Sequence, residues 1–574
     1  MGKIIKPGAV LLLTLCLVHA ACSFLNDNTA SMDAGNPEPL KDCGAALDFS
    51  TYEAEDGNFA GELLNKNFTY YEIQTEASGR KAVKLTNTGD WVEFTLVKPA
   101  NAMALRYCMA DAPGGGGTDG SLAVYREGAK IADISLTSKY AWVYGEYPWT
   151  NDPAAGKGRR FFDESRILFG AELPAGTVVR LLKEDAAAFY IVDSADFELA
   201  AEPLVMPGNF LSIADYGAKA QSGFNNKTAL ANCIIAARSQ NKGVWIPEGV
   251  FEIHNGPVAV NSGLAIQGAG MWYSTLSGPG AAFKLNGGGN YHFADFALFG
   301  DTTVRQDSAP ETGFDGNPGR GSKIQRVWME HLKVGVWAIG ADNLFVENCR
   351  IRNTFADGLN LNAASKNSVV SNCHFRNTGD DSIAIWSQDG SACTGNIIKS
   401  NTIQSPWLAS GIAVYGGGDN TIEKNIVCDT IAFGGGINIS TNHGAANFSG
   451  STRIINNILY RAGSRESNWN YDRGAVWFWA ESKNIEGVEI SGLEMYDSGN
   501  EGITFESGGG KIISAVFRNI TIQGAETYGI HARSGTKGSV TMNSVFVSGT
   551  KLTGLRNEAG GQFIITKGIG CTGW

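Results

Sequence analysis

Two neighbouring stretches of the chain repeat each other: NLFVENCRIRNTFADGLNL, residues 343–361, and NSVVSNCHFRNTGDDSIAI, residues 367–385. They are offset by 24 residues, so that Asn348 matches Asn372 and Leu359 matches Ile383. Related stretches follow to about residue 550. Repeats of roughly 20–30 residues with β-branched runs, Asn and Gly predict a right-handed parallel β-helix, whose stacked coils share one core. Leucine-rich repeats have a similar period, but here each repeat shows several short strands and no leucine consensus.

The overall composition indicates how many domains to expect and which classes of binding partner are disfavoured. The chain has 574 residues, more than one ordinary core organises, so we expect at least two domains. Gly is abundant at 73 residues without a collagen period, which is typical of an all-β protein with many tight turns. The formal net charge of −11 argues against nucleic acid or an anionic membrane as the partner, and fits a neutral ligand such as a polysaccharide.

The N-terminal residues 1–21 are typical of an export signal, because Lys3 and Lys6 precede a short apolar run. Small residues before Cys22 predict a lipoprotein, lipidated on Cys22 and held at the cell surface or in the periplasm; ordinary cleavage near Ala20 or Ala21 would instead give a secreted protein. Composition then divides the rest of the chain into a polar tether (22–44), a β-sandwich of short alternating strands (45–200), a linker (201–209) and the β-helix with a cap helix near its start (210–574).

Three carboxylates stand out in the repeats: Asp357, Asp380 and Asp381. In the repeat register Asp357 lies beside Asp381, and neighbouring parallel strands are about 4.8 Å apart. Like charges this close raise at least one pKa, as a general acid requires. Glycosidic cleavage needs one protonated carboxyl at the leaving oxygen and one carboxylate at the sugar or at a water. One such Asp alone would close a turn. The stacked set favours a catalytic site, exposed at the turn that enters the strand, because a buried pair would be very costly.

Aromatic residues crowd the same strip of sequence and are candidate platforms for sugar rings, which present C–H groups to a π surface. Trp386 matches Tyr415 one coil later, and Trp407 and Trp479 lie nearby in sequence. Packing at the rim of the coils is the alternative for each ring. The candidate polar contacts to substrate are Glu330, Arg352 and His443.

The β-helix half resembles glycoside hydrolase family 87, the α-1,3-glucanases and mycodextranases. The motifs that carry the resemblance are FADFALFGDTTVRQD (293–307), VWMEHLKVGVW (327–337), RIRNTFADGLNL (350–361), FRNTGDDSIAIWS (375–387) and IAVYGGGDNTIEKN (412–425). The family is similar in fold to the polygalacturonases and dextranases, which are inverting enzymes with three catalytic aspartates. The resemblance implies that Asp380 donates the proton while Asp357 and Asp381 activate water.

The polygalacturonase motifs Gly-His-Gly and Arg-Ile-Lys, which grip a uronic acid, do not occur in this chain. Their absence favours a neutral glucan over pectin. The resemblance to family 87 implies endo-acting, inverting hydrolysis of α-1,3-linkages in α-1,3-glucan or nigeran, without a cofactor for catalysis, and we expect a monomer. A polysaccharide lyase or a polygalacturonase-like hydrolase on the same scaffold, and a non-catalytic glycan-binding protein, are the alternatives.

The front segment resembles carbohydrate-binding module families 6 and 35. The motifs are YEAEDG (52–57), GDWVEFTL (89–96) and YIVDSADFEL (190–199). In those families acidic residues at the two chain ends hold a structural calcium, and oxygen ligands of this kind suit Ca²⁺. The resemblance therefore implies a calcium site at Glu53, Glu55 and Asp196. Trp142, Tyr144, Tyr147 and Trp149 cluster in one loop, where they would either bind sugar or pack.

Overall fold

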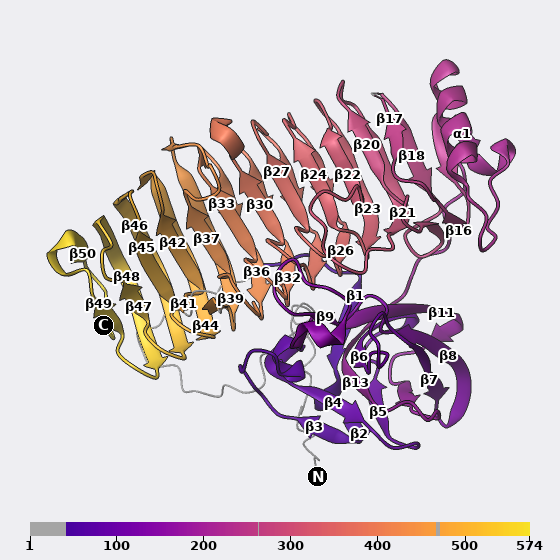
Figure 1. Ribbon diagram of the computed structural model, residues 1–574, viewed down its shortest axis with the longest axis horizontal. Coiled ribbons are helices and arrows are strands. Elements are labelled where there is room, and N and C mark those ends of the chain that lie inside the picture. The colour runs from indigo at the N-terminus through magenta and orange to yellow at the C-terminus, as the bar shows by residue number, and fades with distance from the viewer. Residues whose placement is uncertain (1–41, 262, 467–470) are drawn as a thin grey trace, which may run out of the picture.

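The computed structural model describes residues 42–574 except 262 and 467–470, and consists of a β-sandwich set against a long β-solenoid (Figure 1). The predicted signal peptide and Cys22 lie outside the described residues. None of the helices in the described part of the chain is long and apolar enough to cross a membrane.

The front domain is a sandwich of two antiparallel sheets, as predicted. The two sheets bury a common core that includes Val92, Phe94, Leu105, Leu122 and Tyr190. One sheet has the order β11-β6-β13-β4-β3, with β1 on β13, and the other has the order β2-β5-β12-β7-β8. The strands are β1 (Phe49–Glu53), β2 (Asn58–Ala60), β3 (Glu62–Leu64), β4 (Ala82–Leu85), β5 (Trp91–Thr95), β6 (Ala100–Met109), β7 (Asp119–Arg126), β8 (Ala129–Thr137), β11 (Asp163–Leu173), β12 (Val178–Leu182) and β13 (Tyr190–Glu198), with β9 (Val143–Tyr144) and β10 (Gly158–Arg159) pairing beside them.

The second domain is a parallel β-helix, which confirms the fold class predicted from the repeats. The helix α1 (Lys227–Ser239) covers its first coils (Figure 1). One face is a sheet that carries the cleft described below, called here the cleft sheet. Its strands are β17 (Val258–Val260), β20 (Phe283–Asn286), β22 (Thr312–Asn317), β24 (Val334–Ile339), β27 (Leu359–Asn362), β30 (Ile383–Trp386), β33 (Ile412–Tyr415), β37 (Ile437–Ser440), β42 (Val476–Ala480), β45 (Ile503–Ser507), β47 (Ile530–Ala532) and β49 (Leu555–Asn557).

The remaining face is a longer sheet that bends around the solenoid, and the sandwich docks on its middle part (Figure 1). It runs through β14 (Phe210–Ser212), β15 (Gly243–Ile246), β16 (Gly249–Glu252), β18 (Ala265–Gly268), β19 (Ser274–Ser277), β21 (His292–Phe299), β23 (Lys323–Glu330), β25 (Phe345–Glu347), β26 (Arg350–Arg352), β28 (Val369–Ser371), β29 (His374–Arg376), β31 (Ile397–Lys399), β32 (Thr402–Gln404), β35 (Thr421–Glu423), β36 (Ile426–Cys428), β39 (Thr452–Tyr460), β43 (Ile485–Glu486), β44 (Val488–Ser498), β46 (Ile512–Ala525), β48 (Gly538–Thr550) and β50 (Phe563–Lys567).

The coils stack in the register that the repeats predict. Leu359 pairs with Ile383, and in the next, longer coil Trp386 pairs with Tyr415. Along each strand alternate apolar side chains such as Leu359 and Leu361 point into the core and are fully buried. At the corner between the sheets Asn377 donates its side-chain amide to the Asn353 side chain at 2.7 Å, and both have positive φ, a conformation that Asn tolerates. These corners fix where the following strand of the cleft sheet begins.

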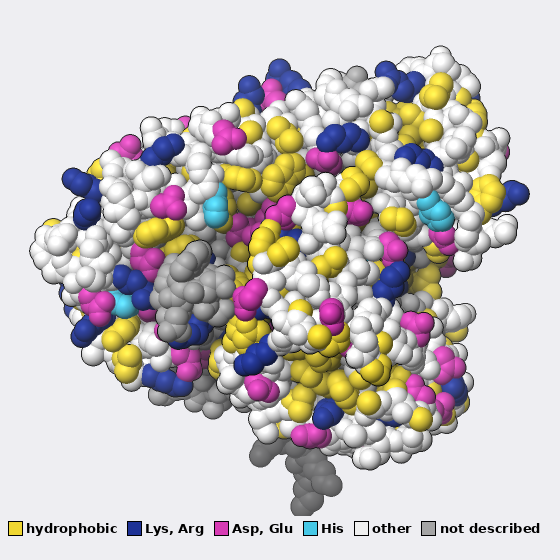
Figure 2. Space-filling view, viewed as in Figure 1, with side chains coloured by type: hydrophobic (Ala, Val, Ile, Leu, Met, Phe, Trp, Pro, Cys, Tyr) yellow, Lys and Arg dark blue, Asp and Glu magenta, His cyan; other side chains and the backbone are white. Residues whose placement is uncertain are grey.

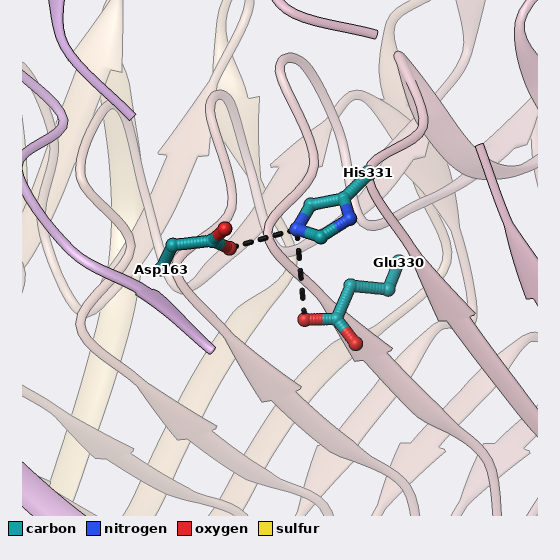
Figure 3. Close-up of side chains that lie close together, drawn as sticks. All are labelled: Asp163, Glu330 and His331. Carbon is teal, nitrogen blue, oxygen red and sulfur yellow. Dashed lines mark hydrogen bonds and ion pairs between the residues drawn. The ribbon is translucent and has the colours of Figure 1, made fainter. Parts of the chain in front are cut away.

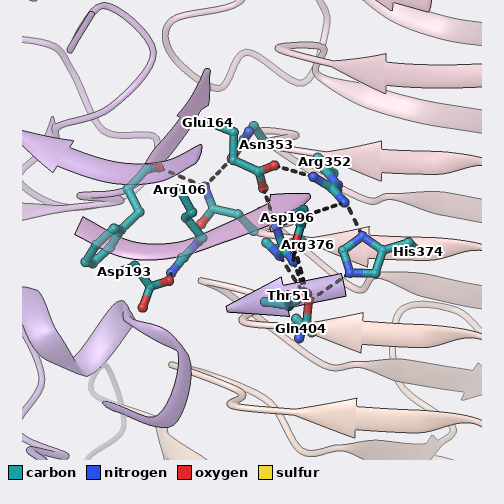
Figure 4. A network of polar contacts seen from close by, with 12 residues as sticks. Thr51, Arg106, Glu164, Asp193, Asp196, Arg352, Asn353, His374, Arg376 and Gln404 are labelled. Atoms are coloured by element: carbon teal, nitrogen blue, oxygen red, sulfur yellow. Dashed lines mark hydrogen bonds and ion pairs between the residues drawn. The ribbon is translucent and has the colours of Figure 1, made fainter. Parts of the chain in front are cut away.

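Buried ion pairs join the sandwich to the β-helix (Figure 4). Arg352 of β26 pairs with Glu164 and with Asp196, the latter at 2.9 Å, and is fully buried. Arg376, one coil on, also pairs with Asp196 at 2.9 Å, and Arg350 pairs with Glu198. Charges without access to water must be paired in this way, so the geometry of the interface is strongly determined.

Candidate active site

The three candidate aspartates lie together at one edge of the cleft sheet. Asp357 precedes β27, and Asp380 and Asp381 precede β30, so one coil spacing separates the two turns. One carboxylate oxygen from each lies within 4.8 Å of the others. The predicted grouping of the three side chains is therefore present. Their exposure differs from the prediction: only Asp380 is substantially open to solvent, with 30% of its side chain exposed, whereas Asp357 and Asp381 are buried.

Hydrogen bonds orient the two buried carboxylates. Asp381 accepts hydrogen bonds from the Ser410 backbone amide at 2.9 Å and from the Tyr415 hydroxyl at 2.6 Å. Asp357 accepts one from the Asn360 side chain at 3.3 Å. Asp381 is thus held more tightly than Asp357.

Asp380 instead faces a guanidinium group. Arg305 Nη1 lies 2.8 Å from an Asp380 oxygen, and Arg305 Nε lies 2.8 Å from an Asp307 oxygen. Asp307 in turn accepts a hydrogen bond from the hydroxyl of Tyr147 in the sandwich. Burial alone would raise the pKa of Asp307, but the hydrogen bonds from Tyr147 and Arg305 outweigh it and hold that pKa below its usual range. Arg305 is therefore shared between two carboxylates.

The electrostatics of the site favour protonation of the buried pair. Burial, and next the charge of Asp380, raise the pKa of Asp381 from 3.8 to about 7, although Tyr415 and Ser410 act in the opposite direction. Burial, Asp380 and Asp381 raise the pKa of Asp357 well above its ordinary value, and Arg305 lowers it in part. Protons shared among close carboxylates belong to the group as a whole. The buried pair can therefore hold and release a proton near neutral pH, as general acid and base catalysis requires.

We expect Asp381→Asn to stabilise the fold at neutral and alkaline pH. The folded chain binds a proton at Asp381 more tightly than the unfolded chain does. The contribution of this group to stability is therefore complete below pH 3.8 and is lost as the pH rises through about 7. An uncharged amide removes that loss. The melting temperatures of parent and variant are measured at about pH 5 and about pH 8. The variant should exceed the parent by a larger margin at the higher pH. A difference that is the same at both pH values would contradict the raised pKa.

A cavity of about 700 Å³ opens over the aspartates. Its floor is the outer face of the cleft sheet, from which Asp315, Trp337, Asn360, Trp386 and Tyr415 project. Figure 2 shows acidic side chains beside hydrophobic ones in a hollow near the junction of the two domains. The other lining residues are Tyr147, Arg305, Asp307, Thr312, Lys333, Val334, Ala356, Asp357, Asp380, Asp381, Gln388 and His443.

Three of the predicted substrate contacts line this cavity. Trp386 is half-buried, and its indole N–H donates to the carbonyl of His443 at 3.0 Å. Its ring lies 6.0 Å from that of Trp337, at 85°. His443 is exposed. Tyr415 is largely buried, and its hydroxyl is engaged by Asp381, so it orients a carboxylate as well as forming part of the wall.

The structure corrects the other four predicted contacts. Trp407 is buried against Trp149 of the sandwich, 5.2 Å between ring centroids, and Arg352 is buried in the ion pairs of the domain interface. Glu330 is buried beside Asn353, away from the cavity wall. Trp479 lies two coils beyond Tyr415 on the same outward row, roughly 10 Å along the sheet, and outside the cavity. The prediction failed for the first three because the sandwich covers that side of the coils.

The sequence reasoning gave no role to several residues of the cavity. Arg305 and Asp307 close one quoted motif, and Lys333 and Trp337 lie in another, but neither motif repeats from coil to coil. Tyr147, from the aromatic loop of the sandwich, reaches the cavity with half of its surface exposed. Of that loop, only Tyr147 lines the cavity, whereas Trp149 packs at the interface.

The predicted calcium ligands do not form one set. Asp196 faces Arg352 and Arg376, which outweigh its burial and lower its pKa. The prediction that Asp196 binds calcium is therefore wrong, because its carboxylate oxygens already pair with two guanidinium groups. Glu53 and Glu55 instead lie near Asp193. Burial, and next the charge of Asp193, raise the pKa of Glu55 to about 8 and that of Glu53 well above its ordinary value. One Glu55 oxygen is buried without a hydrogen-bond partner.

Both halves of the chain match models of known protein families. Residues 46–200 match the family described as alpha-1,3-glucanase catalytic domain D1, and residues 225–571 match alpha-1,3-glucanase catalytic domain D2. The second match alone spans more than half of the chain. The chain belongs to the α-1,3-glucanases of glycoside hydrolase family 87. In this family-87 protein the sandwich is accordingly part of the catalytic unit.

Solved structures of family-87 α-1,3-glucanases superpose over nearly the whole described chain. The catalytic unit of a thermostable enzyme from Streptomyces thermodiastaticus strain HF3-3 is 34% identical, covering 92% of this chain and 97% of that one, with a TM-score of 0.85. The Agl-KA catalytic domain is 27% identical, covering 94% and 100%, with a TM-score of 0.84. A catalytic domain in complex with nigerose is 26% identical, covering 92% and 100%, with a TM-score of 0.82. A search of curated protein sequences gave no match.

Family-87 catalytic domains have also been solved with alanine in place of aspartate at three positions, in complex with nigerose or tetrasaccharides. In those domains the second position follows the first by 23 residues and the third follows the second by one. Asp357, Asp380 and Asp381 have the same spacing.

Proposed function

We propose that this family-87 chain hydrolyses α-1,3-glucosidic linkages within a neutral α-glucan, with inversion at the anomeric carbon, through Asp357, Asp380 and Asp381. The observation that carries the proposal is the convergence of three carboxylates within 4.8 Å at the floor of an open cavity of about 700 Å³. Trp337 and Trp386 offer half-buried rings to the faces of sugar units beside the trio.

In the proposed mechanism Asp380, the most exposed carboxyl, donates a proton to the glycosidic oxygen. Asp357 and Asp381, which lie one coil apart, orient and deprotonate the attacking water. Their raised pKa values mean that the buried pair retains a proton in the free enzyme, and this proton must pass to Asp380 when substrate binds. Arg305 pairs with Asp380 in the free enzyme, at 2.8 Å. For Asp380 to act as donor, the bound sugar must separate it from Arg305, and Asp307 then retains the guanidinium group.

The stereochemical outcome needs a direct measurement, because two observations favour different outcomes. Two carboxyl groups of an inverting enzyme are usually about 6.5–9.5 Å apart, and here the nearest oxygens of all three lie within 4.8 Å. The third carboxylate, however, offers a second hydrogen-bond acceptor for a water, which a retaining pair does not need. Proton NMR of the first product formed from an α-1,3-oligosaccharide distinguishes the two: β-anomer supports inversion, and α-anomer overturns it.

The substrate class and the mode of cleavage are tested by digestion of α-1,3-glucan, nigeran, α-1,4-glucan and pectin, with sizing of the products over time. We expect early release of mixed oligosaccharides from α-1,3-linked substrates only. Release of one short product from the start would overturn internal cleavage. An unsaturated uronate, detected by ultraviolet absorbance, would identify a lyase, and retained binding without turnover a glycan-binding protein.

We expect Arg305→Gln to move the whole pH profile of kcat/KM to higher pH. The guanidinium group lies beside Asp380 and lowers the pKa of Asp357, so its removal raises the pH at which the shared protons leave the trio. Both limbs of the bell-shaped profile should shift upwards on a soluble α-1,3-oligosaccharide. Lys511→Gln removes an exposed positive charge elsewhere on the β-helix and is the matched control. An unshifted profile, or a shift to lower pH, would contradict the role given to Arg305.

We further propose that the sandwich, which resembles binding-module families 6 and 35, contacts the glucan through Tyr147 at the cavity wall. Calcium would be held by Glu53 and Glu55, two buried carboxylates whose pKa values are raised by burial and by neighbouring Asp193. Export as a lipoprotein anchored through Cys22, and a monomeric state, remain predictions. Metabolic labelling with a radioactive fatty acid, compared between parent and Cys22→Ser, tests the anchor.

A further inference from the structure

A second cluster of ionisable side chains lies where the sandwich meets the β-helix (Figure 3). Asp163 begins β11 of the sandwich, whereas Glu330 ends β23 of the β-helix and His331 follows it. His331 Nε2 lies 2.7 Å from Asp163 Oδ1 and 3.9 Å from Glu330 Oε1. One ligand atom of each residue lies within 4.8 Å of the others, and all three side chains are buried. The proposed glucanase mechanism uses none of them.

The surroundings of the cluster are those of a ligand set. Asn353 donates to Glu330 Oε1 at 2.5 Å, and the ring of Tyr140 stacks on His331 at 3.8 Å and 13°. Such outer contacts fix the orientation of metal-binding side chains. The second oxygen of Asp163 is fully buried and has no hydrogen-bond partner. A buried carboxylate oxygen without a partner is costly, and a cation bound to Asp163 would offset that cost.

The geometry also leaves room for an ion and a path to it. Asp163, Glu330 and His331 all form part of the wall of a separate cavity of about 810 Å³ between the domains. Nitrogen and carboxylate ligands about 2.0–2.2 Å from a tetrahedral Zn²⁺ stand roughly 3.3 Å apart. The separations of 2.7 and 3.9 Å from His331 Nε2 lie about 0.6 Å on either side of that value, and all three ligand atoms lie within 4.8 Å of one another. Water from the cavity would complete the coordination.

We propose that Asp163, Glu330 and His331 bind one divalent transition-metal ion of the zinc class, which fastens the sandwich to the β-helix. An imidazole nitrogen together with two carboxylates suits Zn²⁺ and its neighbours, whereas Ca²⁺ takes oxygen ligands. A dication balances the two carboxylates when His331 is neutral. Because one ligand comes from the sandwich and two from the β-helix, the ion bridges the domains.

The test is the metal content of tag-free full-length protein, stripped with a chelator, incubated with Zn²⁺ and dialysed. We expect the parent to retain one more equivalent of zinc per chain than Asp163→Asn or His331→Gln, and to melt at a higher temperature with Zn²⁺ than after stripping. The matched control is His531→Gln. His531 also lies between two carboxylates, but Glu501 faces its Nδ1 at 2.9 Å and Glu558 faces its Nε2 at 3.4 Å, so the two carboxylates cannot share one metal ion with a single ring nitrogen.

Cobalt(II) supplies a readout that survives an unstable variant. Visible absorption of Co²⁺ bound to the parent should report a tetrahedral site with nitrogen and oxygen ligands, and Zn²⁺ should displace it. Equal zinc content in the parent and in both ligand variants, or no bound zinc in the parent, would overturn the proposal and leave a protonated His331 between two carboxylates. None of these measurements depends on glucan hydrolysis.

Discussion

Replacement of Asp380 by Asn is expected to lower kcat on α-1,3-glucan by about 10²–10⁴-fold, the usual contribution of a positioned proton donor. The amide has the size of the carboxyl but cannot protonate the leaving oxygen. Asp380 is also the most exposed of the three carboxyl groups in the cavity, so the substitution removes the group that meets the substrate. Initial rates of reducing-sugar release provide the measurement.

An activated substrate separates a donor role from a structural one. An aryl α-glucoside with an acidic leaving group needs little proton donation, so Asp380→Asn should retain far more of its activity on that substrate than on the glucan. Asp389→Asn, an exposed aspartate in the loop after β30, is the control and should keep parental rates on both. Undiminished hydrolysis of glucan by Asp380→Asn would remove Asp380 from the mechanism, and equal losses on both substrates would remove its donor role.

Replacement of Arg352 by Met is expected to lower the free energy of unfolding by about 3–5 kcal/mol, as breaking a buried ion pair does. Arg352 is fully buried, pairs with Glu164 and Asp196, and donates to His374 at 3.1 Å. Met keeps much of the volume but leaves carboxylates of the sandwich short of a partner. Urea unfolding followed by tryptophan fluorescence measures the change.

An exposed ion pair on the same domain is the control for Arg352→Met. Lys366 lies 3.9 Å from Asp342, with half of its side chain exposed, and such pairs contribute little. Lys366→Met should therefore leave the urea midpoint almost unchanged. A midpoint for Arg352→Met equal to that of the parent would show that the interface does not depend on this network.

The repeats made the grouping of the three aspartates predictable. A fixed register places Asp357 beside Asp381 as soon as Leu359 is aligned with Ile383, and the same alignment carries Trp386 to Tyr415. Periodic positions of a solenoid can be read in this way because each coil contacts only its neighbours. The prediction of exposure was wrong for Asp357 and Asp381, since the next coil places Ser410 and Tyr415 against Asp381.

Residues outside the periodic pattern were not predictable in this way. Arg305 reaches the trio from a loop with no counterpart in neighbouring coils, and Tyr147 arrives from another domain. Docking of one domain on another leaves no period in the sequence. For the same reason Arg352 and Trp407, which the sequence placed near the substrate, belong to the surface that the sandwich covers.

The position of Tyr147 matters for protein engineering. The tyrosine belongs to the front domain, yet it forms part of the wall of the cavity over the three aspartates. Its hydroxyl also donates a hydrogen bond to Asp307, which pairs with Arg305. The front domain therefore cannot be exchanged like a detachable binding module. A chimera that joins this β-helix to a foreign sandwich would have to rebuild one side of the cavity before it could cleave a glucan.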